Sequence, residues 1–183
     1  MRFRLRKIND ADRPWVRGFI SEHWGGESLV VHGNEYHPHL LHGFIAEDGR
    51  GEPIGLGTYV IANAACELVT LDSVFKGEGV GSALIAAVVQ ECRKYRCFRL
   101  WCVTTNDNLP ALAFYQKRDF RIVAVHPGAV ERARILKPSI PLWGIDSIPV
   151  RDEIELEMQL GYGTEQAKAK QMQPRRSRQA AKG

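Results

Sequence analysis

The feature that most constrains the fold is a glycine-containing turn at residues 71–82, which reads LDSVFKGEGVGS. A strand-like run, Cys66–Leu71, precedes the turn, and an amphipathic helical run from Val80 to about Tyr95 follows it. Glycines where a strand becomes a helix let the backbone approach a ligand closely, and the first-turn N–H groups favour an anion such as a phosphate. Because glycines also suit any tight strand–helix turn, this feature alone leaves phosphate binding open.

Spacing excludes two common nucleotide-binding motifs. The chain has no GxxxxGK followed by Ser or Thr, so a Walker A loop is absent. A dinucleotide fingerprint GxGxxG would begin at Gly77 and Gly79, but Ser82 stands where its third glycine belongs. That fingerprint also opens a first βαβ unit, whereas this turn lies in the middle of the chain.

The sequence on either side of the turn alternates between strand-like and helix-like segments. Strands are expected over residues 3–8, 41–46, 53–61, 66–71, 98–104, 120–126 and 151–160. Helices are expected from a cap at Asn9-Asp10 to His23, and over 80–95, 109–117 and 129–136, with residues 24–40 as a loop. Strands in a run that later alternate with helices predict an α/β (α+β) fold with a mixed, partly parallel sheet.

Positive charge is concentrated at the end of the chain. The whole chain carries a formal net charge of +4. Residues 161–183 hold six Lys and Arg side chains against Glu165, a net of +5, and subtracting this from +4 leaves −1 for residues 1–160. We therefore expect one domain, 1–160, and a basic, disordered tail, 161–183. Such tails are more often solvated than bound to DNA, so nucleic acid is not an expected partner.

Composition also bears on location. No run approaches the ~18 apolar residues of a membrane span, and the first residues alternate charged and apolar side chains without the hydrophobic run of a secretory signal. The four cysteines, Cys66, Cys92, Cys97 and Cys102, lack paired CxxC spacing. They are expected to be reduced thiols rather than disulfides or zinc ligands. These features predict a cytoplasmic protein without a membrane partner.

Two blocks of sequence resemble motifs of the GNAT superfamily of acyl-CoA-dependent N-acyltransferases. Residues 76–81, KGEGVG, are similar to its pyrophosphate loop, with Lys76 where the family usually has Arg or Gln. Residues 108–120, NLPALAFYQKRDF, are similar to its pattern Asn-x-x-Ala-x-x-x-Tyr-x-Lys-x-Gly-Phe, with Asp119 in place of the glycine. The resemblance covers roughly residues 53–126. It implies the GNAT fold, a mixed six- to seven-stranded sheet whose parallel central strands splay apart and are flanked by helices.

The resemblance also implies acetyl-CoA as cosubstrate. In the family the pantetheine arm lies between the splayed strands and the diphosphate binds the amides of the glycine loop. The cofactor-binding residues implied here are Leu71, Asp72, Val74, Lys76, Gly77, Gly79, Val80, Gly81 and Ser82. Asn106 or Asn108 could hydrogen-bond the pantetheine. Asn108 fits the motif spacing better, although it can equally cap the helix that follows it.

Acyl transfer from a thioester to an amine needs a base for the amine and an acid for the departing thiolate. Tyr115 matches the family's tyrosine that protonates the thiolate; the alternative is that it only packs its helix onto the sheet. Glu67 in Cys-Glu-Leu-Val resembles the general base of histone-acetylating members; the alternatives are an ion-paired carboxylate or a water as base. Asp72 is a weaker base candidate. Simple strand alternation puts Glu67, Val69 and Leu71 on one face and Asp72 on the other, unless a bulge changes the phase.

Five of the six histidines fall between residues 23 and 42. No HxxxH or HExxH spacing accompanies them, so a metal site is not expected. In the family the segment after the first helix folds over the acceptor, which makes Trp24, His37 and His39 candidate substrate contacts, with surface histidines as the alternative. His126 could also face the acceptor. The long stretch 127–149 contains Trp143, a candidate apolar wall, and Asp146, a candidate anchor for a cationic amine.

The sequence thus predicts an N-acetyltransferase that moves the acetyl group of acetyl-CoA to a primary amine by direct attack in a ternary complex. The alternative is a non-catalytic acyl-CoA-binding regulatory module on the same fold, because a fold by itself does not fix function. The acceptor, a small molecule or a protein amine, is left open. So are the acyl chain used in the cell and the oligomeric state, for which a homodimer is one option.

Overall fold

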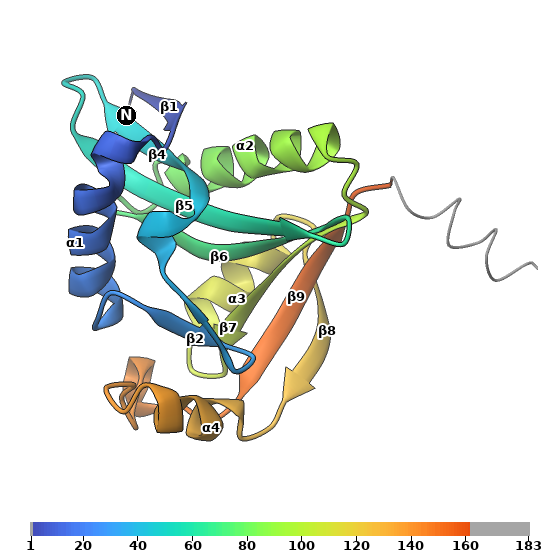
Figure 1. Ribbon diagram of the computed structural model, residues 1–183. Helices are drawn as coiled ribbons and strands as arrows, with labels where there is room; N and C mark the ends of the chain where they lie inside the picture. Colours follow the sequence, from blue (N-terminus) through green and yellow to red (C-terminus); the bar gives the residue numbers. More distant parts are fainter. Residues whose placement is uncertain (1, 162–183) are drawn as a thin grey trace, which may run out of the picture.

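A computed structural model of the protein describes residues 2–161 (Figure 1). The strands and α-helices in this range are β1 (Phe3–Lys7), α1 (Arg13–Trp24), β2 (Leu29–Val31), β3 (Asn34–Tyr36), β4 (His42–Asp48), β5 (Pro53–Ala62), β6 (Ala65–Ser73), α2 (Val80–Lys94), β7 (Arg99–Thr105), α3 (Leu109–Gln116), β8 (Arg121–His126), α4 (Ala129–Leu136) and β9 (Glu153–Gln159). Every expected strand and helix is present. The predicted basic tail, apart from Gly161, lies outside the described residues.

Seven strands form one mixed sheet in the order β1-β4-β5-β6-β7-β9-β8. All neighbours run antiparallel except β6 and β7, which are parallel. These two strands pair only between Ala65–Glu67 and Arg99–Trp101. Beyond these residues both strands continue without pairing to each other, so the central parallel pair splays apart. This confirms the expected GNAT-type mixed sheet.

Helices cover both faces of the sheet (Figure 1). On one face, the α2 face, α2 and α3 form the larger core, in which Leu84, Val88 and Tyr115 pack with Leu100 of β7. On the other, the α1 face, apolar side chains of α1 pack against β4 and β5; they are Val16, Phe19 and Ile20, in contact with Ile45 and Leu56. No helix in the described part of the chain is long and apolar enough to cross a membrane.

The expected loop at residues 24–40 contains structure that the sequence pattern did not predict. It forms the hairpin β2–β3 and a short 3-10 turn, Pro38–Leu40. His32 and Gly33 at the hairpin tip have φ of +48° and +74°, and positive φ at both central residues suits a two-residue hairpin turn. Each strand has only three residues, too few for a period-2 pattern to be recognised.

A bulge in β6 corrects the expected assignment of side chains to faces. Thr58 of β5 pairs with Thr70, whereas the next residue, Tyr59, pairs with Leu68, so Val69 is the extra residue. Leu71 packs against the α2-face core instead of sharing a face with Glu67. Asp72, which alternation placed opposite Glu67, therefore lies with it on the α1 face.

Candidate active site

The glycine loop presents unpaired amides at the start of α2. Gly77 and Gly79 have φ of +83° and +84°, a left-handed conformation that only glycine adopts readily. The first hydrogen bond of α2 runs from the Ala83 N–H to the Gly79 carbonyl. The N–H groups of Val80, Gly81 and Ser82 therefore precede the helical ladder, where the helix dipole favours an anion.

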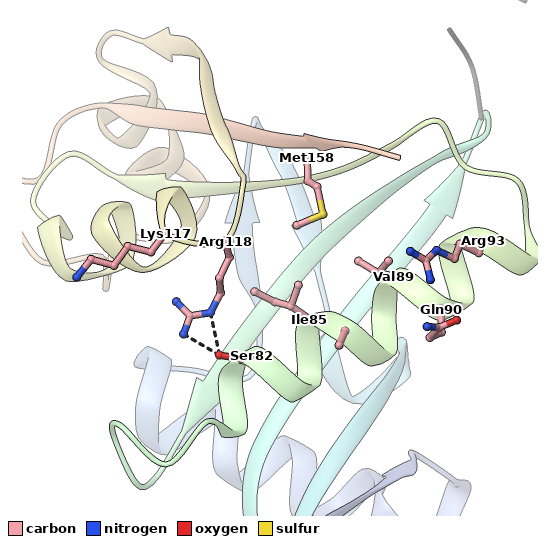
Figure 2. A pocket seen from close by; sticks show the side chains of 9 residues that line it. Ser82, Ile85, Val89, Gln90, Arg93, Lys117, Arg118 and Met158 are labelled. Carbon is pink, nitrogen blue, oxygen red and sulfur yellow. Dashed lines mark hydrogen bonds between the residues drawn. The ribbon is translucent and has the colours of Figure 1, made fainter. Parts of the chain in front are cut away.

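Arg118 ties this loop to α3, which the sequence analysis did not foresee. Its guanidinium donates to the Ser82 hydroxyl from Nε at 2.9 Å and from Nη2 at 2.7 Å (Figure 2). The guanidinium also lies 3.5 Å from the centre of the Phe114 ring. A Cβ on Gly81 would lie 2.9 Å from Cζ of that same ring. The glycine is thus required by the contact between α2 and α3 as well as by any approach to a phosphate.

A groove continues from the loop along α2 toward the end of α3 and β9 (Figure 2). Its lining includes three basic side chains, Arg93, Lys117 and Arg118, and the apolar Ile85, Val89 and Met158. The basic side chains could bind a negatively charged group of a ligand, and the apolar side chains could contact a flat apolar group.

Tyr115 lies on the α2 face next to β7. The residue is only 9% exposed and its ring packs against Phe114 and Phe120. The hydroxyl lies near Cys102 of β7, which influences its pKa. Burial, followed by the Cys102 and Asp72 charges, raises the pKa of Tyr115 well above its usual value. Tyr115 is therefore a protonated phenol at neutral pH, as a general acid must be.

Glu67 lies on the opposite, α1 face of the sheet. It is 7% exposed, and the Tyr36 hydroxyl of the β2–β3 hairpin donates to its Oε2 at 2.8 Å. Burial raises the pKa of Glu67, and the charges of Glu155 and Glu153 raise it further, while the bond from Tyr36 and the charge of Arg99 lower it. A carboxylate with a raised pKa is a better proton acceptor, which suits a general base.

A sequence model described as the acetyltransferase (GNAT) family matches residues 5–120. The chain belongs to the GNAT family of acetyltransferases. It is 40% identical to the uncharacterized protein YdhI of Bacillus subtilis over 146 aligned residues. The alignment covers 80% of this chain and 91% of YdhI.

Two solved structures share the GNAT fold with the chain. An IAA acetyltransferase from Bacillus cereus superposes with a TM-score of 0.64 at 19% identity, over 86% of this chain and 99% of that one. A GNAT acetyltransferase from Elizabethkingia anophelis, solved with acetyl-CoA bound, superposes with a TM-score of 0.60 at 18% identity, over 86% and 97% of the two chains. Family and fold together support acetyl transfer from acetyl-CoA.

The two asparagine candidates of this GNAT protein differ in what they already bind. Asn106 uses both ends of its amide: Nδ2 donates to the Pro149 carbonyl, and Oδ1 accepts from the N–H groups of Arg151 and Asp152. Asn108 accepts from the Ala111 N–H through Oδ1, which confirms it as the cap of α3. Since capping leaves the Asn108 NH₂ group for a ligand, Asn108 is the better candidate for the pantetheine contact, which stays a prediction.

The acceptor candidates after α1 separate into two groups. Trp24 donates from Nε1 to Asp72 Oδ2 at 2.9 Å, which places its indole at the end of β6 beside the glycine loop. His39 is buried against α1, with its Nε2 3.2 Å from Arg17, and His37 lies next to it and near Glu35. No contact of either histidine with Glu67 or Tyr115 is found among the described residues; of these three candidates, Trp24 is the one that lies beside the glycine loop.

The insertion at residues 127–149 folds beside the post-α1 segment. Lys137, just after α4, donates to the carbonyls of Trp24 and Ser28. Trp143 is 63% exposed and Asp146 is also exposed, and neither reaches the two catalytic candidates. Their predicted roles in acceptor binding are not supported by a contact in the structure and stay predictions.

Carboxylates gather on the α1 face, a feature the sequence analysis missed. On β9 the side chains of Ile154, Leu156 and Met158 pack in the α2-face core, so alternation places Glu153, Glu155 and Glu157 on the α1 face. Arg99 of β7 donates to Glu155 and Glu157 at 2.9 and 3.0 Å. The alternating charges of residues 153–157 were visible in the sequence, but their position beside Glu67 depends on the sheet order.

Proposed function

We propose that this GNAT protein transfers the acetyl group of acetyl-CoA to a primary amine by direct attack in a ternary complex. The observation that carries the proposal is the placement of Tyr115 and Glu67 on opposite faces of the sheet at the splayed strands β6 and β7. A thioester held in the gap between these strands would have a phenol on one side and a carboxylate on the other.

The two side chains complete the proton balance of the reaction. Glu67 takes a proton from the ammonium form of the acceptor, and the free amine attacks the thioester carbonyl. The carbon–nitrogen bond forms, the attacking nitrogen loses its second proton to solvent, the carbon–sulfur bond breaks, and the thiolate of CoA takes the hydroxyl proton of Tyr115. Solvent then restores the proton to Tyr115 and removes one from Glu67.

The cofactor is proposed to follow the surface that starts at the glycine loop. The amides of Val80, Gly81 and Ser82 would bind the diphosphate. The groove beyond them, with Arg93, Lys117 and Arg118, matches the phosphorylated adenosine of CoA in charge and in its apolar strip. Leu71, Asp72 and Val74 would supply the backbone along the pantetheine arm, and Lys76 would add positive charge at the mouth of the loop.

The acceptor is proposed to be a cationic amine, because carboxylates dominate the α1 face. Among the described residues, Arg99 makes the ion pairs of Glu155 and Glu157, and no ion pair is found for Glu67 or Asp72. Acidic side chains attract an ammonium and disfavour an anionic substrate. Location in the cytoplasm and self-association remain predictions.

Replacing Tyr36 with phenylalanine tests the role of Glu67. The hydroxyl of Tyr36 favours the ionised form of Glu67, so its loss raises the pKa of that carboxyl. A base must be deprotonated to act, and the acidic limb of the pH profile of kcat/KM is therefore expected to move to higher pH. Activity at low pH falls more than activity at high pH.

Tyr95→Phe is the matched control, since Tyr95 is 62% exposed at the end of α2, and it should leave the limb in place. Glu67→Gln should remove the limb and most of the activity. An acidic limb that stays at the same pH in Tyr36→Phe would show that Glu67 is not the base.

The proposed function is tested by following release of free CoA thiol from acetyl-CoA across a panel of amines. The panel should pair cationic acceptors, such as diamines and peptide N-termini, with neutral and acidic amines of similar size. Transfer to cationic members, confirmed by mass spectrometry of the product, is the expected result. Tight acetyl-CoA binding without transfer or hydrolysis would instead indicate a non-catalytic acyl-CoA-binding module.

A further inference from the structure

Two histidines and a glutamate from three distant segments meet on the α1 face. His32 is at the tip of the β2–β3 hairpin, His126 is the last residue of β8, and Glu155 lies in β9. The Nε2 atoms of His32 and His126 lie 3.7 and 3.5 Å from Glu155 Oε2. All three potential ligand atoms lie within 4.8 Å of one another. We call this group the His32–His126–Glu155 cluster.

Both histidine nitrogens in the cluster lack a hydrogen-bond partner among the described residues, although both are inaccessible to solvent. A buried polar atom left without a hydrogen-bond partner destabilises the folded protein. The other oxygen of Glu155 accepts from Arg99 at 2.9 Å, which leaves Oε2 directed to the histidines. The cluster therefore brings three potential ligand atoms together, and neither histidine nitrogen has a hydrogen-bond partner among the described residues.

Glu153 orients the ring of His32 as a metal ligand. The Nδ1 atom of His32 lies 2.9 Å from Glu153 Oε2, and the His32 backbone N–H donates to the same carboxylate. A proton held on Nδ1 by Glu153 leaves the lone pair on Nε2, which faces the cluster. Carboxylates commonly orient metal-bound histidines in this way. The ring of His32 is further held against Trp101, with centroids 5.8 Å apart.

We propose that the His32–His126–Glu155 cluster binds a divalent transition metal of the zinc class. Two ligands with bonds of 2.0–2.1 Å to a tetrahedral zinc lie about 3.3–3.4 Å apart. The observed 3.5 and 3.7 Å separations between the histidine nitrogens and Glu155 are close to this value, and the two nitrogens lie within 4.8 Å of each other.

Two other kinds of cation, an ammonium group and the oxygen-preferring ions magnesium and calcium, fit the cluster less well than zinc. Acceptors around an ammonium at hydrogen-bond distances near 2.9 Å would lie about 4.7 Å apart, wider than either histidine–glutamate separation. Imidazole nitrogens also select zinc, copper, iron or nickel over magnesium and calcium, which prefer oxygen ligands. No metal site was expected from the sequence because the histidines show no HxxxH or HExxH spacing, and the three residues of the cluster come from segments far apart in the chain.

The proposed metal would lie in the carboxylate-rich surface beside Glu67. The charge of Glu155 already reaches Glu67, so a bound dication would favour the ionised form of that carboxylate. Three protein ligands leave a fourth tetrahedral position for water or another donor. The site is thus placed to influence the acceptor side of the protein.

Metal binding is tested on the untagged full chain, stripped with a chelator and titrated with zinc. Calorimetry and elemental analysis after gel filtration should give one zinc per chain. Co²⁺ should produce the visible absorption of a four-coordinate site, a readout that needs no variant. Magnesium, calcium and putrescine, the last as an ammonium probe, should not compete with zinc.

Three variants and one control locate the ion. His126→Gln and Glu155→Gln are expected to weaken zinc binding at least tenfold, and Glu153→Gln about 10–100-fold through loss of histidine orientation. His42→Gln, a histidine stacked on Tyr59 outside the cluster, should bind zinc like the parent. Thermal unfolding verifies that each variant is folded.

Absence of stoichiometric zinc binding by the parent chain would overturn the proposal, as would undiminished binding by folded His126→Gln and Glu155→Gln. Putrescine binding at the cluster without zinc binding would also overturn it and assign the group to an ammonium. None of these readouts depends on acetyl transfer, so failure here leaves the proposed function standing.

Discussion

Replacing Tyr115 with phenylalanine is expected to lower kcat by about 10²-fold while changing the affinity for acetyl-CoA little. The substitution keeps the ring packed between Phe114 and Phe120 and removes only the hydroxyl proton. Burial raises the pKa of Tyr115, but a thiolate formed in the same low-polarity site is also deprived of water and gains proton affinity. Transfer between the two therefore remains feasible.

The measurement is single-turnover acetyl transfer, in which chemistry limits the rate, with CoA affinity measured separately. Tyr59→Phe is a suitable control because Tyr59 is also buried in the α2-face core, at 5% exposure, on a different strand. An undiminished rate in Tyr115→Phe would leave Tyr115 as a packing residue. The acid would then have to be sought in water.

Replacing Gly81 with aspartate is expected to weaken CoA binding by two orders of magnitude or more. The variant places a carboxylate among the amides proposed for the diphosphate. A hydrogen bond to a charged group contributes about 1.5–3 kcal/mol, or roughly 10–100-fold in Kd, and like-charge repulsion adds to that loss. Strain against Phe114, 2.9 Å from the added Cβ, contributes to the effect.

Gly81→Asn separates charge from strain, since it shares the shape of aspartate without its charge. Gly81→Asn should lose less affinity than Gly81→Asp. Gly18→Asp on α1, where a Cβ meets no atom within 4 Å, should bind CoA like the parent. Calorimetry with CoA and thermal unfolding give the comparison. If folded Gly81→Asp bound CoA as tightly as the parent, the diphosphate would have to bind elsewhere.

The local elements of this protein were readable from its sequence because their determinants lie within a few residues. Pro14 in the first turn of α1, Asn108 at the cap of α3 and the glycines before α2 all act on adjacent backbone. Two motif blocks in order then indicated the family, which the match over residues 5–120 confirms.

Two features that depend on pairing between strands were not predictable from the sequence. The bulge at Val69 is a property of the β5–β6 register, and it moved Asp72 to the face of Glu67. The β2–β3 hairpin has strands too short to show a period, yet it brings Tyr36 to Glu67. Neither event leaves a local signal, because its stabilisation comes from partners elsewhere in the chain.

The sequence by itself determined the order along the chain of the seven strands of the main sheet and the four α-helices, the glycine loop, and the positions of Tyr115 and Glu67 in these elements. Only the tertiary structure decided which side chains share a surface. His32, His126 and Glu155 are separated by 94 and 29 residues along the chain and meet because β8 and β9 are neighbours and the hairpin folds over them. Periodicity specifies the face of each element, but long-range packing specifies which faces meet.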